Sequence, residues 1–138
     1  MTDQPLRTAT CGCGALSVRT TGAPERAMLC SCRSCQSRTG SGISLSAYWT
    51  EDQIVTRGAA TEWVRDCQDG RQALHRFCPT CGTTLWWTMD VFPGLIGVAG
   101  GAFADGDFLE PAKAYWASLR PGWVDRIRTV ETLDRQGT

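Results

Sequence analysis

Seven of the eight cysteines in this 138-residue chain fall into three short clusters, and Cys67 stands alone. The clusters are Cys11-Gly12-Cys13-Gly14, then Cys30-Ser31-Cys32-Arg33-Ser34-Cys35, then Cys78-Pro79-Thr80-Cys81-Gly82. Structural zinc sites are closed by four protein ligands, whereas catalytic zinc sites have three and keep one position open. Seven clustered thiolates therefore divide naturally into one closed set of four and one open set of three.

The compartment decides whether cysteines bind metal or one another. Residues 1–10 contain no apolar h-region, so we expect no secretory signal peptide and a location in the reducing cytoplasm, where stable disulfides are rare. No apolar run approaches the ~20 residues that span a bilayer, so we expect no membrane segment. Four disulfides remain the alternative interpretation of an even cysteine count.

The first and third clusters predict a closed structural site on Cys11, Cys13, Cys78 and Cys81. Residues i and i+2 of an extended segment point to the same face, so both sulfurs of the first pair can bind one ion. In the third cluster, Pro79 fixes one φ angle and Gly82 permits a left-handed turn that aims N–H groups at sulfur. Such a site joins the N-terminus to a point more than sixty residues away, which restricts the unfolded chain. Buried apolar cysteines are the alternative for either pair.

The second cluster predicts an open, catalytic zinc site on Cys30, Cys32 and Cys35. Three thiolates within six residues can surround one ion and leave a fourth position for water or a substrate thiol, and an all-sulfur set suits Zn²⁺. A redox Cys-x₂-Cys pair is one alternative, and a closed site completed by Cys67 or His75 is another.

Charge and composition exclude several classes of protein. Fourteen basic residues balance fourteen acidic ones, so the chain lacks the basic excess of a dedicated nucleic-acid binder. A length of 138 residues, 42% of them hydrophobic, predicts one domain with its own core.

The hydrophobic pattern predicts a mostly β fold. Short alternating or β-branched runs are separated by Gly and Pro turns, and Gln68-Asp69-Gly70 is a hairpin signal. Helical periodicity is weak, with one turn expected at Cys32–Arg38 and an uncertain stretch at Trp123–Thr132. The expected strands are Ala15–Thr21, Ile43–Trp49, Ile54–Arg57, Glu62–Cys67, Arg71–Cys78, Thr83–Met89 and Leu95–Ala99.

Several other side chains are candidates for roles near the open site. Arg33 and Arg38 are the nearest cations in sequence and are candidates for binding a substrate carboxylate. His75 is interpreted as a polar residue on a strand, with a catalytic or ligand role as the alternative. On the expected strand, Trp86 and Trp87 face opposite sides. The other four tryptophans are expected in the core or at its rim, and a substrate-lining role is the alternative.

The order Cys-x-Cys-Gly, Cys-x-Cys-x₂-Cys, Phe77-Cys78-x₂-Cys81-Gly82 resembles the glutathione-dependent formaldehyde-activating (GFA) family, whose domain is shared with centromere protein V. The resemblance covers roughly residues 8–125, which we take as a single GFA-type zinc-binding domain with flexible termini at 1–7 and 134–138. It implies small coiled antiparallel β-sheets pinned by a structural zinc. It also implies two Zn²⁺ per chain, on the same two cysteine sets that the spacing predicts.

The resemblance further implies a carbon–sulfur lyase that joins formaldehyde to glutathione as S-(hydroxymethyl)glutathione. The expected partner is a small thiol such as glutathione, with no nucleic acid and no membrane. The chain departs from the family pattern at Ser31, where many members have histidine, and at Ala114-Tyr115-Trp116, where many have a His-Ile-like pair. Two other functions are open at this point: a non-catalytic thiol carrier, and a structural zinc module for protein interaction.

Overall fold

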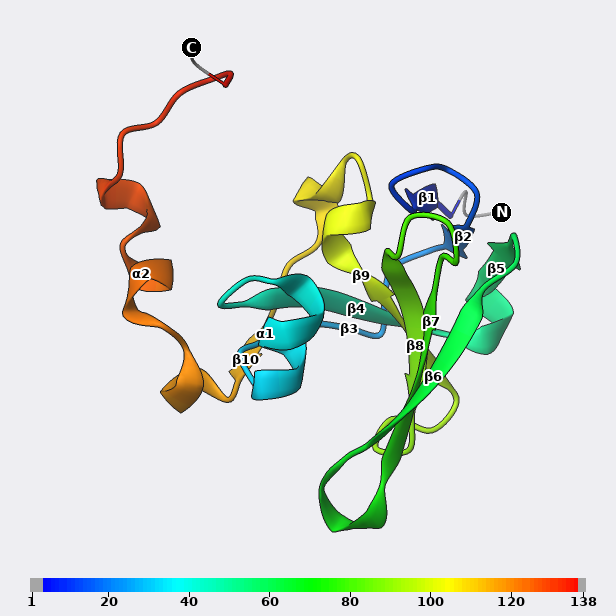
Figure 1. The fold of residues 1–138 in the computed structure, drawn as a ribbon. Helices are drawn as coiled ribbons and strands as arrows, with labels where there is room; N and C mark the ends of the chain where they lie inside the picture. Colours follow the sequence, from blue (N-terminus) through cyan, green and yellow to red (C-terminus); the bar gives the residue numbers. More distant parts are fainter. Residues whose placement is uncertain (1–3, 137–138) are drawn as a thin grey trace.

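The computed structural model describes residues 4–136, which form two β-sheets with few helical segments (Figure 1). The smaller sheet has three antiparallel strands in the order β1-β2-β5, and the larger has seven in the order β10-β3-β4-β9-β8-β7-β6. All neighbours in the larger sheet are antiparallel except β10 and β3, which are parallel. The strands are β1 (Leu6–Thr10), β2 (Ser17–Thr21), β3 (Arg26–Cys30), β4 (Ser44–Thr50), β5 (Ile54–Arg57), β6 (Thr61–Asp66), β7 (Gln72–Phe77), β8 (Thr84–Met89), β9 (Leu95–Ala99) and β10 (Lys113–Tyr115).

Helical structure is confined to short pieces. Helix α1 (Arg33–Thr39) begins at the second cysteine cluster and ends at Gly40, whose φ of 66° gives the left-handed cap that glycine favours. Helix α2 (Gly122–Asp125) is a single turn. The 3₁₀ turns are η1 (Glu51–Gln53), η2 (Gln68–Gly70), η3 (Gly100–Ala102), η4 (Gly106–Phe108), η5 (Ala117–Leu119) and η6 (Ile127–Thr129).

The mostly β prediction is confirmed, including the hairpin over residues 68–70 and the helical turn that becomes α1. Three strands have no counterpart in the sequence analysis: β1, β3 and β10. Strand β3 is hidden because Ala27 and Met28 are adjacent and both buried, so the strand lacks the alternation that a half-exposed strand shows. Strand β1 begins at Leu6, two residues before the domain boundary expected at residue 8. Residues 1–3 and 137–138 of the expected flexible termini lie outside the described residues.

The main core lies between the small sheet and one face of the large sheet. Val18 of β2, Trp49 of β4 and Leu85 of β8 are fully buried in it, and Cys11 and Cys78 belong to the same cluster. The Trp49 indole Nε1 donates to the carbonyl of Gly22 at 3.0 Å, which satisfies its one polar group. The core therefore includes sulfurs from two distant parts of the chain.

The opposite face of the large sheet carries a second, smaller hydrophobic cluster. Met28, Tyr48 and Trp87 form it, and Met89 and Phe92 pack against them. As expected, Trp86 and Trp87 face opposite sides of β8: Trp86 packs on the main core and Trp87 on this second cluster. Both faces of the central strands are thus covered, and the second face leads to the three-cysteine cluster.

The expectation that the remaining tryptophans are core or rim residues is wrong for three of them. Trp49 is buried, but Trp63, Trp116 and Trp123 are 54%, 46% and 52% exposed. Trp63 lies on β6, an edge strand of the large sheet. Trp116 and Trp123 lie in the segment that follows β10, drawn in orange in Figure 1. Edge strands and terminal segments bury fewer side chains than the centre of a sheet, which the local sequence does not reveal. Within residues 4–136, no helix is long and apolar enough to cross a membrane.

Candidate metal centres and the adjoining pocket

The four cysteines of the first and third clusters meet at one point. Cys11 and Cys13 follow β1, and Cys78 and Cys81 lie in the turn between β7 and β8. Their four Sγ atoms lie within 4.8 Å of one another, with Cys11 and Cys78 buried and Cys13 and Cys81 exposed. The Sγ atoms of Cys11 and Cys13 are 3.7 Å apart, and those of Cys13 and Cys78 are 3.6 Å apart.

Backbone groups hold these sulfurs in place. The N–H of Leu16 donates to the Cys11 Sγ at 3.2 Å, and Gly82 N–H donates to the Cys78 carbonyl at 2.8 Å to close the turn. Gly82 has a φ of 78°, the left-handed conformation that the sequence predicts. The hydroxyl of Thr83 lies 3.3 Å from the Cys81 sulfur, and this contact, together with backbone hydrogen bonds from Thr83 and Cys13, lowers the pKa of that thiol to about 5.

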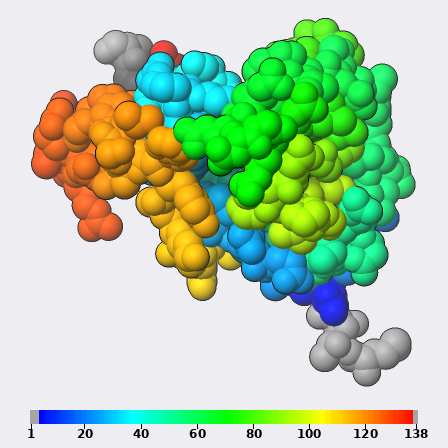
Figure 2. Space-filling view, turned by 90° about the horizontal axis from the view of Figure 1, so that it is seen from below, coloured from blue at the N-terminus to red at the C-terminus, as the bar shows by residue number. Residues whose placement is uncertain are grey.

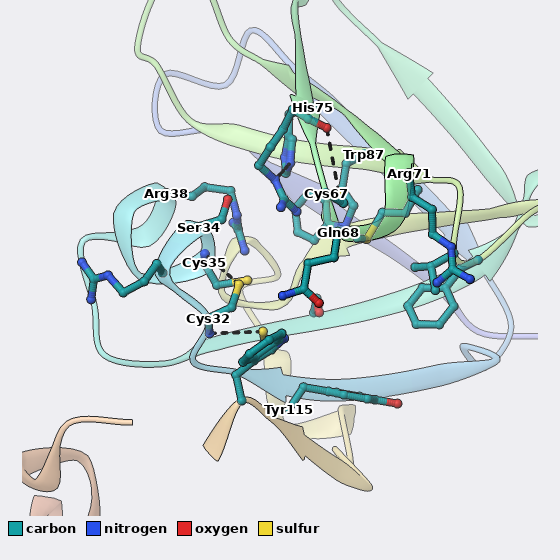
Figure 3. Close-up of a pocket in the computed structure, with 18 of the residues that line it drawn as sticks. Cys32, Ser34, Cys35, Arg38, Cys67, Gln68, Arg71, His75, Trp87 and Tyr115 are labelled. Atoms are coloured by element: carbon teal, nitrogen blue, oxygen red, sulfur yellow. Dashed lines mark hydrogen bonds between the residues drawn. The ribbon is translucent and has the colours of Figure 1, made fainter. Parts of the chain in front are cut away.

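The second cluster is built by the junction of β3 and α1. Cys30 ends β3, Cys32 is the N-cap of α1, and Cys35 lies in its first turn. The N–H of Cys35 donates to the Cys32 Sγ at 3.3 Å, so the sulfur takes the place of the oxygen that usually caps a helix. The N–H of Cys32 donates to the Cys30 Sγ at 3.5 Å. The three Sγ atoms lie within 4.8 Å of one another (Figure 3).

The pKa values of the Cys30 and Cys35 thiols shift in opposite directions. Hydrogen bonds from Cys30 and Cys32 lower the pKa of the Cys35 thiol, and the positive charge of Arg38 lowers it further. The same contacts with Cys32 and Cys35 raise the pKa of Cys30. These contacts favour the first negative charge of the cluster at Cys35, in the first turn of α1.

Of the described residues, no fourth histidine, cysteine or carboxylate completes the Cys30, Cys32 and Cys35 set within 4.8 Å. The two candidates for that role, Cys67 and His75, instead line the pocket beside the cluster. All eight cysteines are free thiols.

A pocket of about 700 Å³ opens beside the three sulfurs. In Figure 2 it lies between α1, in cyan, the β6–β7 hairpin, in green, and the β10–η5 segment, in orange. Figure 3 shows the Cys32 and Cys35 side chains directed into it and Gln68 reaching in from the hairpin. The pocket thus brings together β3, α1, the hairpin and β10, which are far apart in the sequence.

Both candidate arginines line this pocket. The Arg38 guanidinium lies 4.5 Å from the centre of the Trp87 ring, a cation–π contact that holds it against the pocket wall. The Arg33 Nη1 donates to the Gln36 side chain at 3.0 Å and lies nearer the surface.

His75 lies on strand β7, as its interpretation as a polar strand residue requires, and it is buried. It is 5% exposed and lies between the rings of Trp63 and Trp87, with centroid separations of 5.6 and 5.7 Å. Its Nε2 accepts from the Arg65 Nε at 3.4 Å, and its Nδ1 has no hydrogen-bond partner among residues 4–136. Burial lowers the pKa of His75 to about 4, and the charges of Arg65 and Arg38 act in the same direction, so the ring is neutral at pH 7.

Most other pocket residues have no role predicted from sequence. Tyr115 was noted only as a departure from the family pattern, whereas Trp116 is one of the tryptophans for which a substrate-lining role was the alternative. Both form one wall because β10 pairs with β3 and the Ser31 N–H donates to the Tyr115 carbonyl at 3.0 Å. The hairpin residues Gln68 and Arg71 form another wall. The hairpin signal predicted the turn itself, but nothing in the local sequence places that turn against a cysteine cluster more than thirty residues earlier in the chain.

The donor sets fit zinc. A tetrahedral ion with Zn–S bonds of about 2.3 Å separates its sulfurs by about 3.8 Å, close to the 3.6 and 3.7 Å found in the four-cysteine cluster. A disulfide would require a separation of about 2.05 Å. All seven donors are sulfurs, which favour zinc over hard cations. Both clusters could therefore hold metal ions.

Comparisons with known proteins agree with this geometry. Residues 6–119 match the family model described as glutathione-dependent formaldehyde-activating enzyme. A crystal structure of a Rhodobacter sphaeroides protein superimposes with a TM-score of 0.59 at 23% identity, covering 78% of this chain and 98% of that one. At this identity the likeness concerns the fold alone. No curated protein is similar enough to this chain to count as a match.

Proposed function

The chain belongs to the glutathione-dependent formaldehyde-activating family, and on that premise we propose that it is a zinc-dependent carbon–sulfur lyase. Its substrate is glutathione or a related small thiol adduct, as in S-(hydroxymethyl)glutathione synthase. The GFA-type domain spans residues 8–125. A reducing cytoplasm, which we propose as its location, keeps the cysteines available for metal.

The proposal assigns each cysteine set one Zn²⁺. Cys11, Cys13, Cys78 and Cys81 hold a structural ion, and Cys30, Cys32 and Cys35 hold the catalytic ion. When bound at the second site, zinc supplies a position at which a substrate thiol loses its proton readily. Structural zinc typically adds binding free energy to folding, and the four-cysteine cluster is partly embedded in the main core.

In the reaction, the sulfur of the thiol forms a bond to the aldehyde carbon. The C=O double bond becomes a C–O single bond, and the proton released by the thiol ends on that oxygen; the lyase direction reverses these changes. Arg38 and Arg33 bind a carboxylate of the thiol substrate. The pocket walls of β10 and the hairpin surround the reacting groups and reduce contact with water.

One observation carries this proposal: three sulfurs gathered within 4.8 Å open onto a pocket that holds cationic side chains. A closed structural module needs a fourth protein ligand, and a redox pair needs only two cysteines. An open three-sulfur site is the arrangement that a metal-bound thiol substrate requires.

Metal content and turnover together test the proposal. Wild-type protein is expected to hold about two zinc ions per chain and to speed formation of the adduct from glutathione and formaldehyde above the uncatalysed rate. Cys32→Ser is expected to hold one ion, to keep its circular dichroism spectrum and to lose turnover. Cys67→Ser, a cysteine change in the same pocket but outside the cluster, serves as the matched control and should retain both ions.

Two results would contradict the proposal. One ion per chain in the wild type, unchanged in Cys32→Ser, would rule out the open site. Tight glutathione binding with two ions but no rate acceleration would replace the lyase by a thiol carrier.

A further inference from the structure

The floor of the pocket is apolar right up to the three-cysteine cluster. Met28 lies two residues before Cys30 on β3, so both side chains project from the same face of the sheet. Tyr48 of β4 and Trp87 and Met89 of β8 continue this face, and all of them line the pocket. A ligand whose sulfur sits at the cysteines therefore meets a hydrophobic surface immediately beside its reacting carbon.

The polar atoms of this floor are already paired with one another. The Trp87 Nε1 donates to the Tyr48 hydroxyl at 3.0 Å, and the Tyr48 hydroxyl lies 3.4 Å from the Met89 sulfur and donates to it. Burial raises the pKa of Tyr48, so its hydroxyl stays protonated. The floor offers a ligand no free donor in these groups, and covering it with an apolar group removes hydrophobic surface from water.

Cationic side chains also line this pocket, and one of them, Arg38, lies against the Trp87 ring. The pocket lining includes Arg65 and Arg71 of the hairpin in addition to the two arginines of α1. The two ion pairs among the described residues use other arginines, Arg76 and Arg120, so these four have no carboxylate partner. The carboxylates of a glutathione-like thiol fit there, which leaves the floor for the part of the adduct contributed by the aldehyde.

We infer that the site acts on thiol adducts whose aldehyde-derived carbon carries an apolar substituent. This inference rests on the proposed function and specifies its substrate class. A hydroxymethyl group has a single carbon and leaves the floor uncovered, whereas an alkyl or aryl group of several carbons covers it. The reaction is RS–H + R′CHO ⇌ RS–CH(OH)R′, in which an S–C bond forms and the thiol proton moves to the former carbonyl oxygen.

Stable thioethers test the floor without turnover. Binding of S-methylglutathione and S-hexylglutathione to zinc-loaded wild-type protein is measured by calorimetry. Because each buried CH₂ adds roughly threefold to fourfold in affinity, S-hexylglutathione is expected to bind at least about tenfold more tightly. Equal affinities, stronger binding of the methyl compound, or no binding of either would overturn the inference.

Two variants test whether the pocket floor causes the preference for the hexyl compound. Met89→Gln changes the floor with little change in side-chain length and is expected to reduce the hexyl-to-methyl ratio below about threefold. Val55→Gln, an exposed apolar residue on β5 of the other sheet, is the matched control and should keep the wild-type ratio. A ratio that survives Met89→Gln, or that falls equally in Val55→Gln, would overturn the assignment of the floor.

Failure of this inference is distinct from failure of the proposed function. A protein that catalyses the formaldehyde reaction but shows no hexyl preference keeps the function and loses the substrate class. A protein that shows the preference but no turnover with any aldehyde keeps the apolar subsite and loses the lyase activity.

Discussion

The guanidinium of Arg38 lies 4.5 Å from the centre of the Trp87 ring, at the edge of the pocket that holds the second cysteine cluster. Trp87 is itself packed against His75, and His75 against Trp63, so four side chains form one stack. A guanidinium stacked on a ring keeps the N–H donors at its own edges free for other partners. The stack therefore holds a fixed positive charge beside Cys35.

Replacing Arg38 tests this charge. Arg38→Gln is expected to raise the KM for glutathione about tenfold or more with a smaller change in kcat, because a charge-assisted hydrogen bond to a carboxylate is worth roughly 1.5–3 kcal/mol. Steady-state kinetics with glutathione and formaldehyde measure the effect.

The control for Arg38 is Arg19→Gln, which removes an exposed arginine from β2 of the other sheet. It should leave the KM unchanged. A glutathione diester supplies a second control, since its KM should be insensitive to Arg38→Gln. A drop in kcat alone, with equal KM values, would show that Arg38 does not bind the substrate carboxylate.

Gly97 makes room for the Trp87–Tyr48 contact. A Cβ at position 97 would lie within 2.7–2.8 Å of Tyr48 and Trp87 carbons and closer still to the Trp87 Nε1. We expect Gly97→Ala to lower the free energy of unfolding by about 1–3 kcal/mol, because the rings must shift out of a well-packed arrangement. Urea denaturation followed by tryptophan fluorescence measures the change.

Gly101→Ala is the matched substitution for Gly97→Ala, since a Cβ there meets nothing within 4 Å. It should change stability by less than about 0.5 kcal/mol. Equal stability of the two variants would mean that Gly97 is not required by the packing of Trp87.

Much of the fold was predictable because most of its strands have a recognisable local sequence pattern. Ile54–Arg57 and Leu95–Ala99 were predicted with the observed bounds, since each is a short β-branched or apolar run between turn residues. Strand β10 could not be predicted in this way. Its residues are exposed, and only pairing with β3 makes it a strand. Local pattern captures burial and turns, whereas pairing partners depend on the whole chain.

The two cysteine sets were predictable for a different reason: thiolates are preferred zinc ligands, and here they occur in short clusters with metal-binding spacings. The structure brings together the predicted set of four, Cys11, Cys13, Cys78 and Cys81. It also brings together the predicted set of three, Cys30, Cys32 and Cys35. The pocket was not predictable, because its walls come from β10 and from the hairpin at residues 68–71. Spacing along the chain identifies ligands but not the elements that fold over them.

The two clusters should contribute differently to stability. Cys78 is fully buried in the main core, whereas Cys32 is half-buried at the start of α1. Cys78→Ser is therefore expected to unfold the protein at room temperature, because it removes a structural ligand and buries a hydroxyl without a partner. Cys32→Ser should retain a cooperative thermal transition. Circular dichroism melts of both variants, with zinc content measured on the same samples, make the comparison, and two melts of similar midpoint would contradict it.

His75 is the only histidine of the chain, so its protonation can be followed without overlap. Burial lowers its pKa from 6.5 to about 4, and Arg65 and Arg38 add to the effect, while the negative charge of Cys35 opposes it. Because the pKa is lower in the folded state, the unfolded state binds the proton more readily, and stability falls as pH drops from about 6.5 toward 4.

In the zinc-loaded protein, the imidazole Cε1–H resonance of His75 should keep its neutral position down to about pH 5.5. His75→Phe, which retains an aromatic ring between Trp63 and Trp87, should lose less stability than the wild type between pH 7.5 and 5. The loss of stability between these pH values should differ between the two proteins by on the order of 1 kcal/mol, a figure that is reduced for solvent screening at the pocket. Comparing the two proteins over the same pH range cancels the common effect of acid on the cysteine sites. In the NMR measurement, a His75 resonance that titrates near pH 6.5 would contradict the prediction, because it would show that the ring is solvated and not packed between Trp63 and Trp87.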